Sequence, residues 1–193
     1  MNENVKRPVS ATLIGTEQAL QARYGASESK FAIRTNETIE VLLSHRSVRA
    51  YLPDALPAGT LEAVVAAAQS AASSSNVQCW SVVAVTDPKV KAELAQVAGG
   101  QKHMEECPVL LVWIADLART KMLGVRHDYP TEATPYLESY TVAIVDAALA
   151  AQNATVAAES FGLGTVYIGA MRNNPQRVAE LLKLPPNAFG CFG

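Results

Sequence analysis

The sequence predicts one globular domain that mixes α-helices with buried β-strands. The chain has 193 residues, which is long enough for a single domain with a full hydrophobic core. Apolar residues make up 49% of it and charged residues only 18%, below the usual quarter. Apolar stripes of helical period alternate with short valine-rich runs, which are typical of buried strands. We find no internal repeat and no low-complexity linker.

The first clear helix leads into a basic turn. We interpret residues 1–35 as an N-terminal extension and assign it no function. Asn36 is a predicted N-cap, and an apolar stripe follows it as far as Leu43. The next five residues are His45-Arg46-Ser47-Val48-Arg49, which we call the basic turn. Guanidinium, imidazole and hydroxyl groups suit a phosphate. A basic helix end that only offsets the helix dipole is the alternative.

The middle of the chain alternates helices and strands. Helices are predicted over residues 58–71 and 89–97, and buried strands over 80–86 and 109–114. Ser73-Ser74-Ser75-Asn76 lies between the first helix and the first strand. It is either a flexible loop or a set of donors facing a ligand. Residues 101–103 form a loop or a new helical turn.

The second half begins with an irregular stretch over residues 117–135, which we expect to be an exposed insertion. Residues 136–161 form the longest predicted helix. Because this helix is apolar on all sides, we expect it to be buried at the centre of the fold, near a subunit interface. Its Asp146 and Glu159 are expected to be structural polar groups. A third strand over 166–168, a helix over 175–182 and a strand from Phe189 complete the chain.

Composition and motifs exclude several functions. A net charge of −2 argues against nucleic acid as a partner. No apolar run approaches the length of a membrane span and no signal peptide is recognisable, so we expect a cytoplasmic protein. The three cysteines lack metal spacing and are expected to be buried. No P-loop, nucleophile elbow or zinc-protease motif occurs. Many donor groups without a nucleophile indicate a phosphorylated cofactor that carries the reaction.

An ordered set of motifs resembles the nitroreductase superfamily, in particular its oxygen-insensitive NADPH nitroreductase and flavin reductase branch. The resemblance runs from about Asn36 to Gly193. The motifs are the basic turn, Ser73-Ser74-Ser75 with Val77-Gln78-Cys79, Gly99-Gly100-Gln101-Lys102-His103, Ala151-Gln152-Asn153, and Gly162-Leu163-Gly164-Thr165-Val166-Tyr167-Ile168-Gly169 through Arg172-Asn173-Asn174.

The resemblance implies an α+β, nitroreductase-like fold, in which helices wrap a mainly antiparallel sheet and two chains form an intertwined homodimer. It also implies non-covalently bound FMN, with no catalytic side chain and no metal. The implied cofactor-binding residues are His45, Arg46, Ser47, Arg49, Ser73, Ser75, Gln101, Tyr167, Ile168, Gly169 and Ala170. Next to these stretches, Asn76 and Arg172 are the substrate-binding candidates.

The implied reaction passes two electrons from NADPH, or NADH, through FMN to nitroaromatics, quinones or free flavin in two half-reactions at one site. Members of this branch are expected to continue for several tens of residues past the strand at Phe189. Residues 36–193 are therefore expected to be an FMN-binding domain without the family's C-terminal tail. A non-catalytic flavin-binding or carrier module is the first alternative. The second is a dimeric scaffold whose basic turn is only a helix end.

Overall fold

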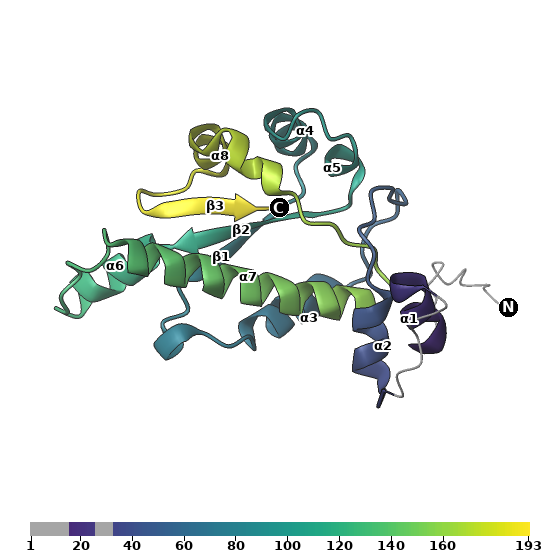
Figure 1. Ribbon diagram of the computed structural model, residues 1–193. Coiled ribbons are helices and arrows are strands. Elements are labelled where there is room, and N and C mark those ends of the chain that lie inside the picture. The colour runs from purple at the N-terminus through teal and green to yellow at the C-terminus, as the bar shows by residue number, and fades with distance from the viewer. Residues whose placement is uncertain (1–15, 26–32) are drawn as a thin grey trace, which may run out of the picture.

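The computed structural model describes residues 16–25 and 33–193. Most of the predicted extension lies outside this part, but it contributes helix α1, Thr16–Tyr24. Helix α1 lies beside α2, Glu37–Ser44 (Figure 1). Ala19 of α1 is fully buried, and Arg23 donates to the Leu43 carbonyl at 2.9 Å. Helix α1 of the extension is therefore docked on the helix that leads into the basic turn.

Three antiparallel strands form the sheet. They are β1, Trp80–Val85, β2, Leu110–Asp116, and β3, Ala188–Phe192, in the order β1-β2-β3. Val83 pairs with Val112, and Ile114 pairs with Gly190 after a register shift in β2. The predicted antiparallel sheet is confirmed.

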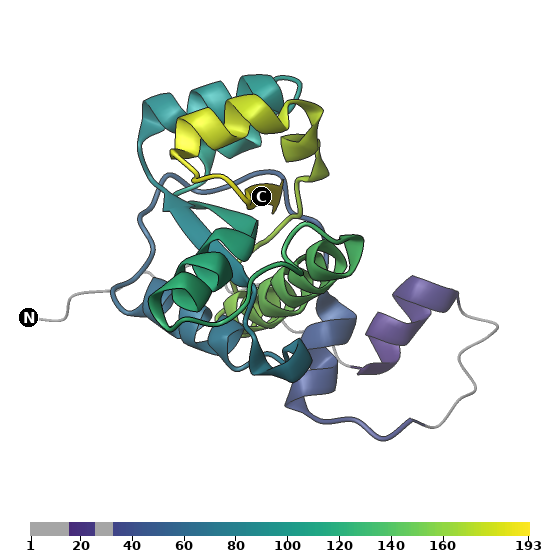
Figure 2. The same ribbon diagram turned by 90° about the vertical axis from the view of Figure 1, so that its left-hand side faces the viewer.

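Helices cover both faces of this sheet (Figures 1 and 2). One face carries α4, Pro88–Val97, α5, His103–Glu106, and α8, Pro175–Leu182; the other carries α3, Thr60–Gln69, and α7, Leu137–Ser160. Side chains of β2 point alternately to the two faces. Val112 and Ile114 belong to the core under α4 and α8, whereas Trp113 packs on α7. This arrangement confirms the predicted α+β class.

Short polar side chains set three of the helix starts. Asn36 accepts from the Ile39 amide at 3.0 Å, Asp87 from the Lys89 amide at 2.7 Å, and Asn174 from the Arg177 amide at 3.0 Å. Each satisfies an amide that the first helical turn leaves without a partner. The predicted N-cap at Asn36 is confirmed.

Two predicted elements are wrong. The stretch after β2 was expected to be irregular, yet residues Leu117–Arg126 form helix α6, because the Asp116 carboxylate caps the Arg119 amide at 3.0 Å. Residues 166–168 were expected to form a strand, but they are extended and belong to no strand. Their neighbour Thr165 makes only an isolated bridge.

Helix α7 is the central helix, as predicted, but it is not buried all round. Val145 is 50% exposed and Leu149 42%. Contrary to the sequence expectation, α7 is long and apolar enough to cross a membrane by length and composition alone. Its inner face packs on the sheet and α3, and Asp146 is almost fully buried in the same helix. We therefore interpret α7 as the core helix of the domain.

Candidate functional site

The basic turn begins where α2 ends. His45 is the C-cap of α2, and its backbone leaves the helical conformation there. Arg46, Ser47 and Arg49 are exposed. The Arg46 Nη1 donates to the His45 carbonyl at 2.7 Å, whereas the Arg49 guanidinium has no hydrogen-bond partner among the described residues. The turn thus presents two accessible guanidinium groups.

A distant segment holds this turn in place. Ser47 and Thr165 form an isolated parallel bridge, and the Val48 amide donates to the Thr165 carbonyl at 2.9 Å. Gly164 lies directly against Val48. A Cβ on this glycine would come within 2.8 Å of the stiff, β-branched valine side chain. The absence of a side chain at Gly164 therefore allows the basic turn and the glycine-containing segment to meet.

Residues 167–170 continue from that contact. Tyr167 and Ile168 line a cavity of about 810 Å³, together with Val48. The size lies in the range of small-molecule sites, but Arg46, Ser47 and Arg49 are not among the residues that line it. Ile168 exchanges two backbone hydrogen bonds with Gly193, and its side chain is buried. Gly169 and Ala170 open the 3₁₀ turn η2, Gly169–Asn173.

Two further predicted residues lie near this turn. Gln101 follows α4, and its side-chain amide donates back to the Ala98 carbonyl at 2.9 Å. Asn173 of η2 donates to the Val97 carbonyl at the end of α4, so the two segments are neighbours. The Arg172 guanidinium donates to the Cys191 carbonyl of β3 at 2.6 Å. In this structure one donor of Arg172 is therefore engaged by the sheet.

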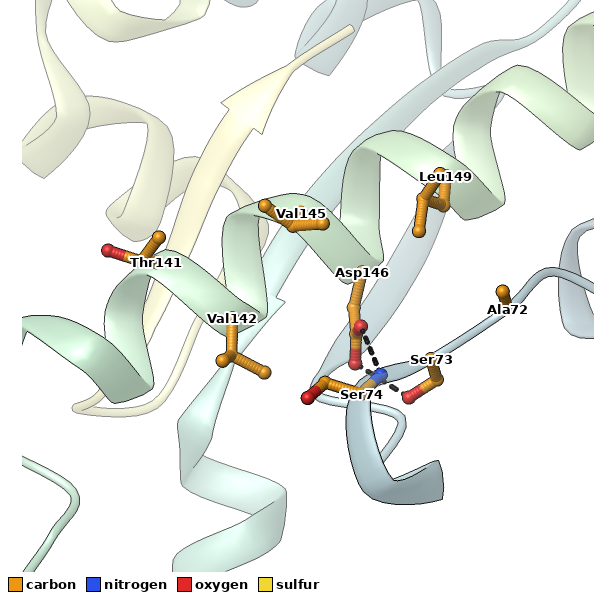
Figure 3. Close-up of a pocket in the computed structure, with 8 residues that line it drawn as sticks. All are labelled: Ala72, Ser73, Ser74, Thr141, Val142, Val145, Asp146 and Leu149. Atoms are coloured by element: carbon orange, nitrogen blue, oxygen red, sulfur yellow. Dashed lines mark hydrogen bonds between the residues drawn. The ribbon is translucent and has the colours of Figure 1, made fainter.

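The serine-rich stretch, residues 73–78, is a tightly bonded loop and not a flexible one. We call it the serine loop. The buried Asp146 carboxylate accepts from the Ser73 hydroxyl at 2.8 Å and the Ser74 amide at 3.2 Å (Figure 3). It also accepts from the Cys79 amide at 3.1 Å. On the opposite side, Arg119 of α6 donates to the Gln78 carbonyl. Asp146 is thus a satisfied structural group, as predicted.

These anchors hold an unusual backbone. Ser75, Asn76 and Gln78 all have φ near +50°, a backbone conformation that residues other than glycine rarely adopt. Each such residue costs on the order of 1 kcal/mol or more, so the surrounding bonds must stabilise the loop. Ser75 and Asn76 remain exposed at its tip.

The structure brings together one part of the predicted site but not the other. The basic turn and residues 165–170 lie side by side through the Thr165 contacts. The serine loop is anchored at Asp146, and the basic turn meets α7 at Glu159, 13 residues further along. At 1.5 Å per residue, this separation is about 20 Å along the helix. Within one chain, the serine loop therefore lies at a distance from the basic turn.

The groove beside the serine loop is apolar. It has a volume of about 390 Å³, and Figure 3 shows its wall on α7. The lining side chains of α7 other than Asp146 are Thr141, Val142, Val145 and Leu149. The exposed stripe of α7 thus runs directly past the serine loop.

The sequence analysis did not predict the contact of Glu159 with the basic turn. Its Oε1 lies 2.6 Å from His45 Nδ1 and 3.0 Å from the Thr165 hydroxyl. Glu159 is a satisfied polar group, as expected, but its contact with the basic turn was not predicted. The available signal was its position in the last helical turn, directly before the glycine motif.

Nucleophilic or metal chemistry finds no support in the described part of the chain. Burial raises the pKa of the thiols of Cys79, Cys107 and Cys191, which keeps them protonated. Among the described residues, no group of three histidine, cysteine or acidic side chains could hold a metal ion. The three cysteines are buried, as predicted.

Because of Tyr51, just beyond the basic turn, we expect the free energy of unfolding to decrease in alkali. Burial raises its pKa from 10.0 to about 12, and its hydroxyl donates to the Val48 carbonyl at 3.0 Å. Above pH 10 the unfolded chain loses this proton while the folded chain keeps it, so the free energy of unfolding falls until about pH 12. The loss is at most about 2.7 kcal/mol, reduced where water reaches the ring.

Urea unfolding between pH 9 and pH 12 measures this effect. The cysteines and other tyrosines also ionise here, so the Tyr51→Phe variant serves as the reference. Its free energy of unfolding should fall less steeply with pH than that of the wild type. Equal slopes would contradict the assignment to Tyr51.

Comparison with known proteins gives consistent matches. The profile described as "Nitroreductase family" matches residues 42–101 and 96–193. The chain is 45% identical over 159 residues to an FMN reductase [NAD(P)H] of Bacillus subtilis, covering 82% of this chain and 64% of that protein. It is 40% identical to the oxygen-insensitive NADPH nitroreductase of Salmonella typhimurium, covering 81% and 63%.

A solved structure agrees with the sequence matches. The NfrA1 nitroreductase of Bacillus subtilis superposes with a TM-score of 0.79 at 40% identity, covering 81% of this chain and 64% of that one. The chain thus spans less than two thirds of the length of the curated relatives it matches.

Proposed function

The chain belongs to the nitroreductase family, and from this premise we propose that it is an FMN-dependent oxidoreductase. It would pass two electrons from NADPH, or NADH, to nitroaromatic compounds, quinones or free flavin. The names of two relatives, an FMN reductase [NAD(P)H] and an NADPH nitroreductase, support the cofactor and the donor. We place the protein in the cytoplasm as part of the same proposal.

The observation that carries the proposal is the contact between the basic turn and residues 165–170. An FMN molecule needs donors for a phosphate and a backbone surface for a flat ring. Arg46 and Arg49 present exposed guanidinium groups, and Ser47 lies between them. Through the Thr165 bridge, these donors lie next to the segment containing Tyr167 and Ile168. The residues present therefore fit the cofactor.

The side chains would have distinct tasks. Arg46, Ser47 and Arg49 would bind the phosphate, with His45 beside them. Residues 167–170 would line the ring, and Gln101 would contact the ring or the ribityl chain. A bound flavin would supply the redox chemistry itself, by accepting a hydride from the nicotinamide and passing two electrons to the acceptor. Donor and acceptor would occupy one face in turn, and the protons taken up by the reduced acceptor would come from water. The chain would then supply position and polarity without an acid–base residue of its own.

A homodimer would complete this site. Ser75 and Asn76 belong to the serine loop, whose anchor Asp146 lies about 20 Å along α7 from Glu159 at the basic turn of the same chain. The serine loop of a second copy would have to supply these groups. The exposed Val145 and Leu149, together with the half-buried Val142, form an apolar surface beside that loop, which supports its burial against a partner. Asn76 and Arg172 are our candidates for contacts with the substrate.

The visible spectrum of the purified protein, recorded before and after NADPH is added without oxygen, tests the proposal. We expect the two flavin bands, and we expect NADPH to bleach them. Bands that persist with both NADPH and NADH would favour a non-catalytic flavin-binding module. A colourless protein that takes up no added FMN would contradict the proposal.

A further inference from the structure

We infer that Glu159 is a positioning residue for the cofactor site, because it orients the imidazole of His45 at the edge of the basic turn. The inference rests on the proposed function for its ligand, FMN. It concerns a contact between residues 114 positions apart in the sequence. Glu159 would not touch the cofactor itself.

The contact fixes which ring nitrogen is available to a ligand. Glu159 Oε1 accepts from the Thr165 hydroxyl, so we assign it the acceptor role toward His45 as well, and Nδ1 of His45, 2.6 Å away, then carries the proton. The bond made by one imidazole nitrogen determines the role of the other. Nε2 has no hydrogen-bond partner among the described residues, and the side chain is 37% exposed. In this tautomer Nε2 carries the lone pair, so it is the nitrogen that can accept a hydrogen bond from a hydroxyl or amide group of a ligand.

The position of Glu159 indicates a role other than helix stability. It lies in the last turn of α7, where the helix dipole disfavours a negative charge. Its side chain is only 11% exposed, so water compensates little of the cost. His45 and the Thr165 hydroxyl supply the compensation, since both donate to the same oxygen.

Glu159 connects three segments at this one point. It belongs to α7, His45 belongs to the basic turn, and Thr165 belongs to the segment that the basic turn meets by a bridge. The carboxylate therefore sets the orientation of the imidazole relative to the two segments proposed to hold the phosphate and the ring.

Two variants of Glu159 and one control test the inference. Glu159→Ala removes the acceptor, whereas Glu159→Gln keeps an uncharged acceptor. Glu138→Gln changes an exposed glutamate at the other end of the same helix. The first readout is the ¹⁵N spectrum of the His45 ring without FMN, which reports the nitrogen that carries the proton. The second is the FMN dissociation constant, from flavin fluorescence.

We expect protonated Nδ1 in the wild type, loss of that preference in Glu159→Ala, and its retention in Glu159→Gln and Glu138→Gln. The FMN dissociation constant should rise about tenfold in Glu159→Ala, and roughly threefold in Glu159→Gln. An unchanged ring spectrum in folded Glu159→Ala, or FMN affinity within twofold of wild type, would overturn the inference. If the wild type binds no FMN, the proposed function fails, and the ring spectrum alone then decides whether Glu159 orients His45.

Discussion

Replacing both Arg46 and Arg49 with alanine is expected to weaken FMN binding by about two to four orders of magnitude. Each guanidinium would donate charge-assisted hydrogen bonds to the phosphate, and each such bond contributes roughly 1.5–3 kcal/mol, or about one to two orders of magnitude in affinity. Both side chains are exposed, so the free energy of unfolding should change by less than about 0.5 kcal/mol. Titration of FMN at fixed ionic strength, followed by flavin fluorescence, measures the effect.

Two comparisons show whether the loss is specific. Arg126→Ala removes another exposed arginine, in the last turn of α6, and should leave the affinity unchanged. Arg49→Lys keeps the charge but loses the planar fork, so it should weaken binding less than Arg49→Ala. Wild-type affinity in the double alanine variant would mean that the basic turn is only a helix end.

The sequence predicted most helices and strands because their signals are local. Asn36 caps α2 through an amide three residues away, and β2 is an apolar run that follows a proline. Such signals lie within one element, so they survive whatever packs around it. Helix α6 was missed although its cap, Asp116, is of the same kind. The residues that follow α6 form a loop, and they were interpreted together with the short apolar pattern of the helix as one irregular stretch.

The predictions that depended on distant partners were less complete. Residues 166–168 have the composition of a strand, but among the described residues their neighbour Thr165 bridges to Ser47 alone and the backbone of Ile168 bonds to Gly193 alone. Amino-acid composition indicates a preference for extended backbone, whereas a strand also needs a neighbouring strand that pairs with it along its length. The contact of Glu159 with His45 was not predictable from either local pattern, because the fold alone brings them together.

The candidate site was predicted by family resemblance more than by physical pattern. From the basic turn alone, a phosphate site and a basic helix end without a ligand were equally good interpretations. The structure adds the bridge to Thr165, which places the turn beside residues 165–170. It also shows that the serine loop is anchored at Asp146, 13 residues along α7 from the contact of the basic turn with Glu159, which a linear sequence cannot reveal.

Replacing Asp146 with alanine should be the most destabilising of these changes. Asp146 is 1% exposed and accepts three hydrogen bonds, from Ser73, Ser74 and Cys79. Its loss leaves these donors without an acceptor, and the expected decrease in the free energy of unfolding is about 3–5 kcal/mol. Thermal unfolding would measure this as a decrease of roughly 6–20 °C in the melting temperature. Asp146→Asn, which keeps the shape and one acceptor, should cost less.

Hydrogen exchange locates the effect. The Ser74 and Cys79 amides should lose protection in Asp146→Asn, because their acceptor is weakened and the strained backbone at Ser75 can relax. The control is Asp54→Asn, an exposed aspartate. Unchanged protection in Asp146→Asn, or an equal loss in the control, would show that other contacts hold the serine loop.

The same variant tests whether two chains share each site. If the serine loop of one chain completes the site of the other, Asp146→Asn should weaken FMN binding although it lies about 20 Å from its own basic turn. Co-expression with the double alanine variant of Arg46 and Arg49 should then restore one intact site per mixed dimer, or about a quarter of all sites under random pairing. A site built from one chain predicts no such recovery, because every chain in the mixture carries a defect.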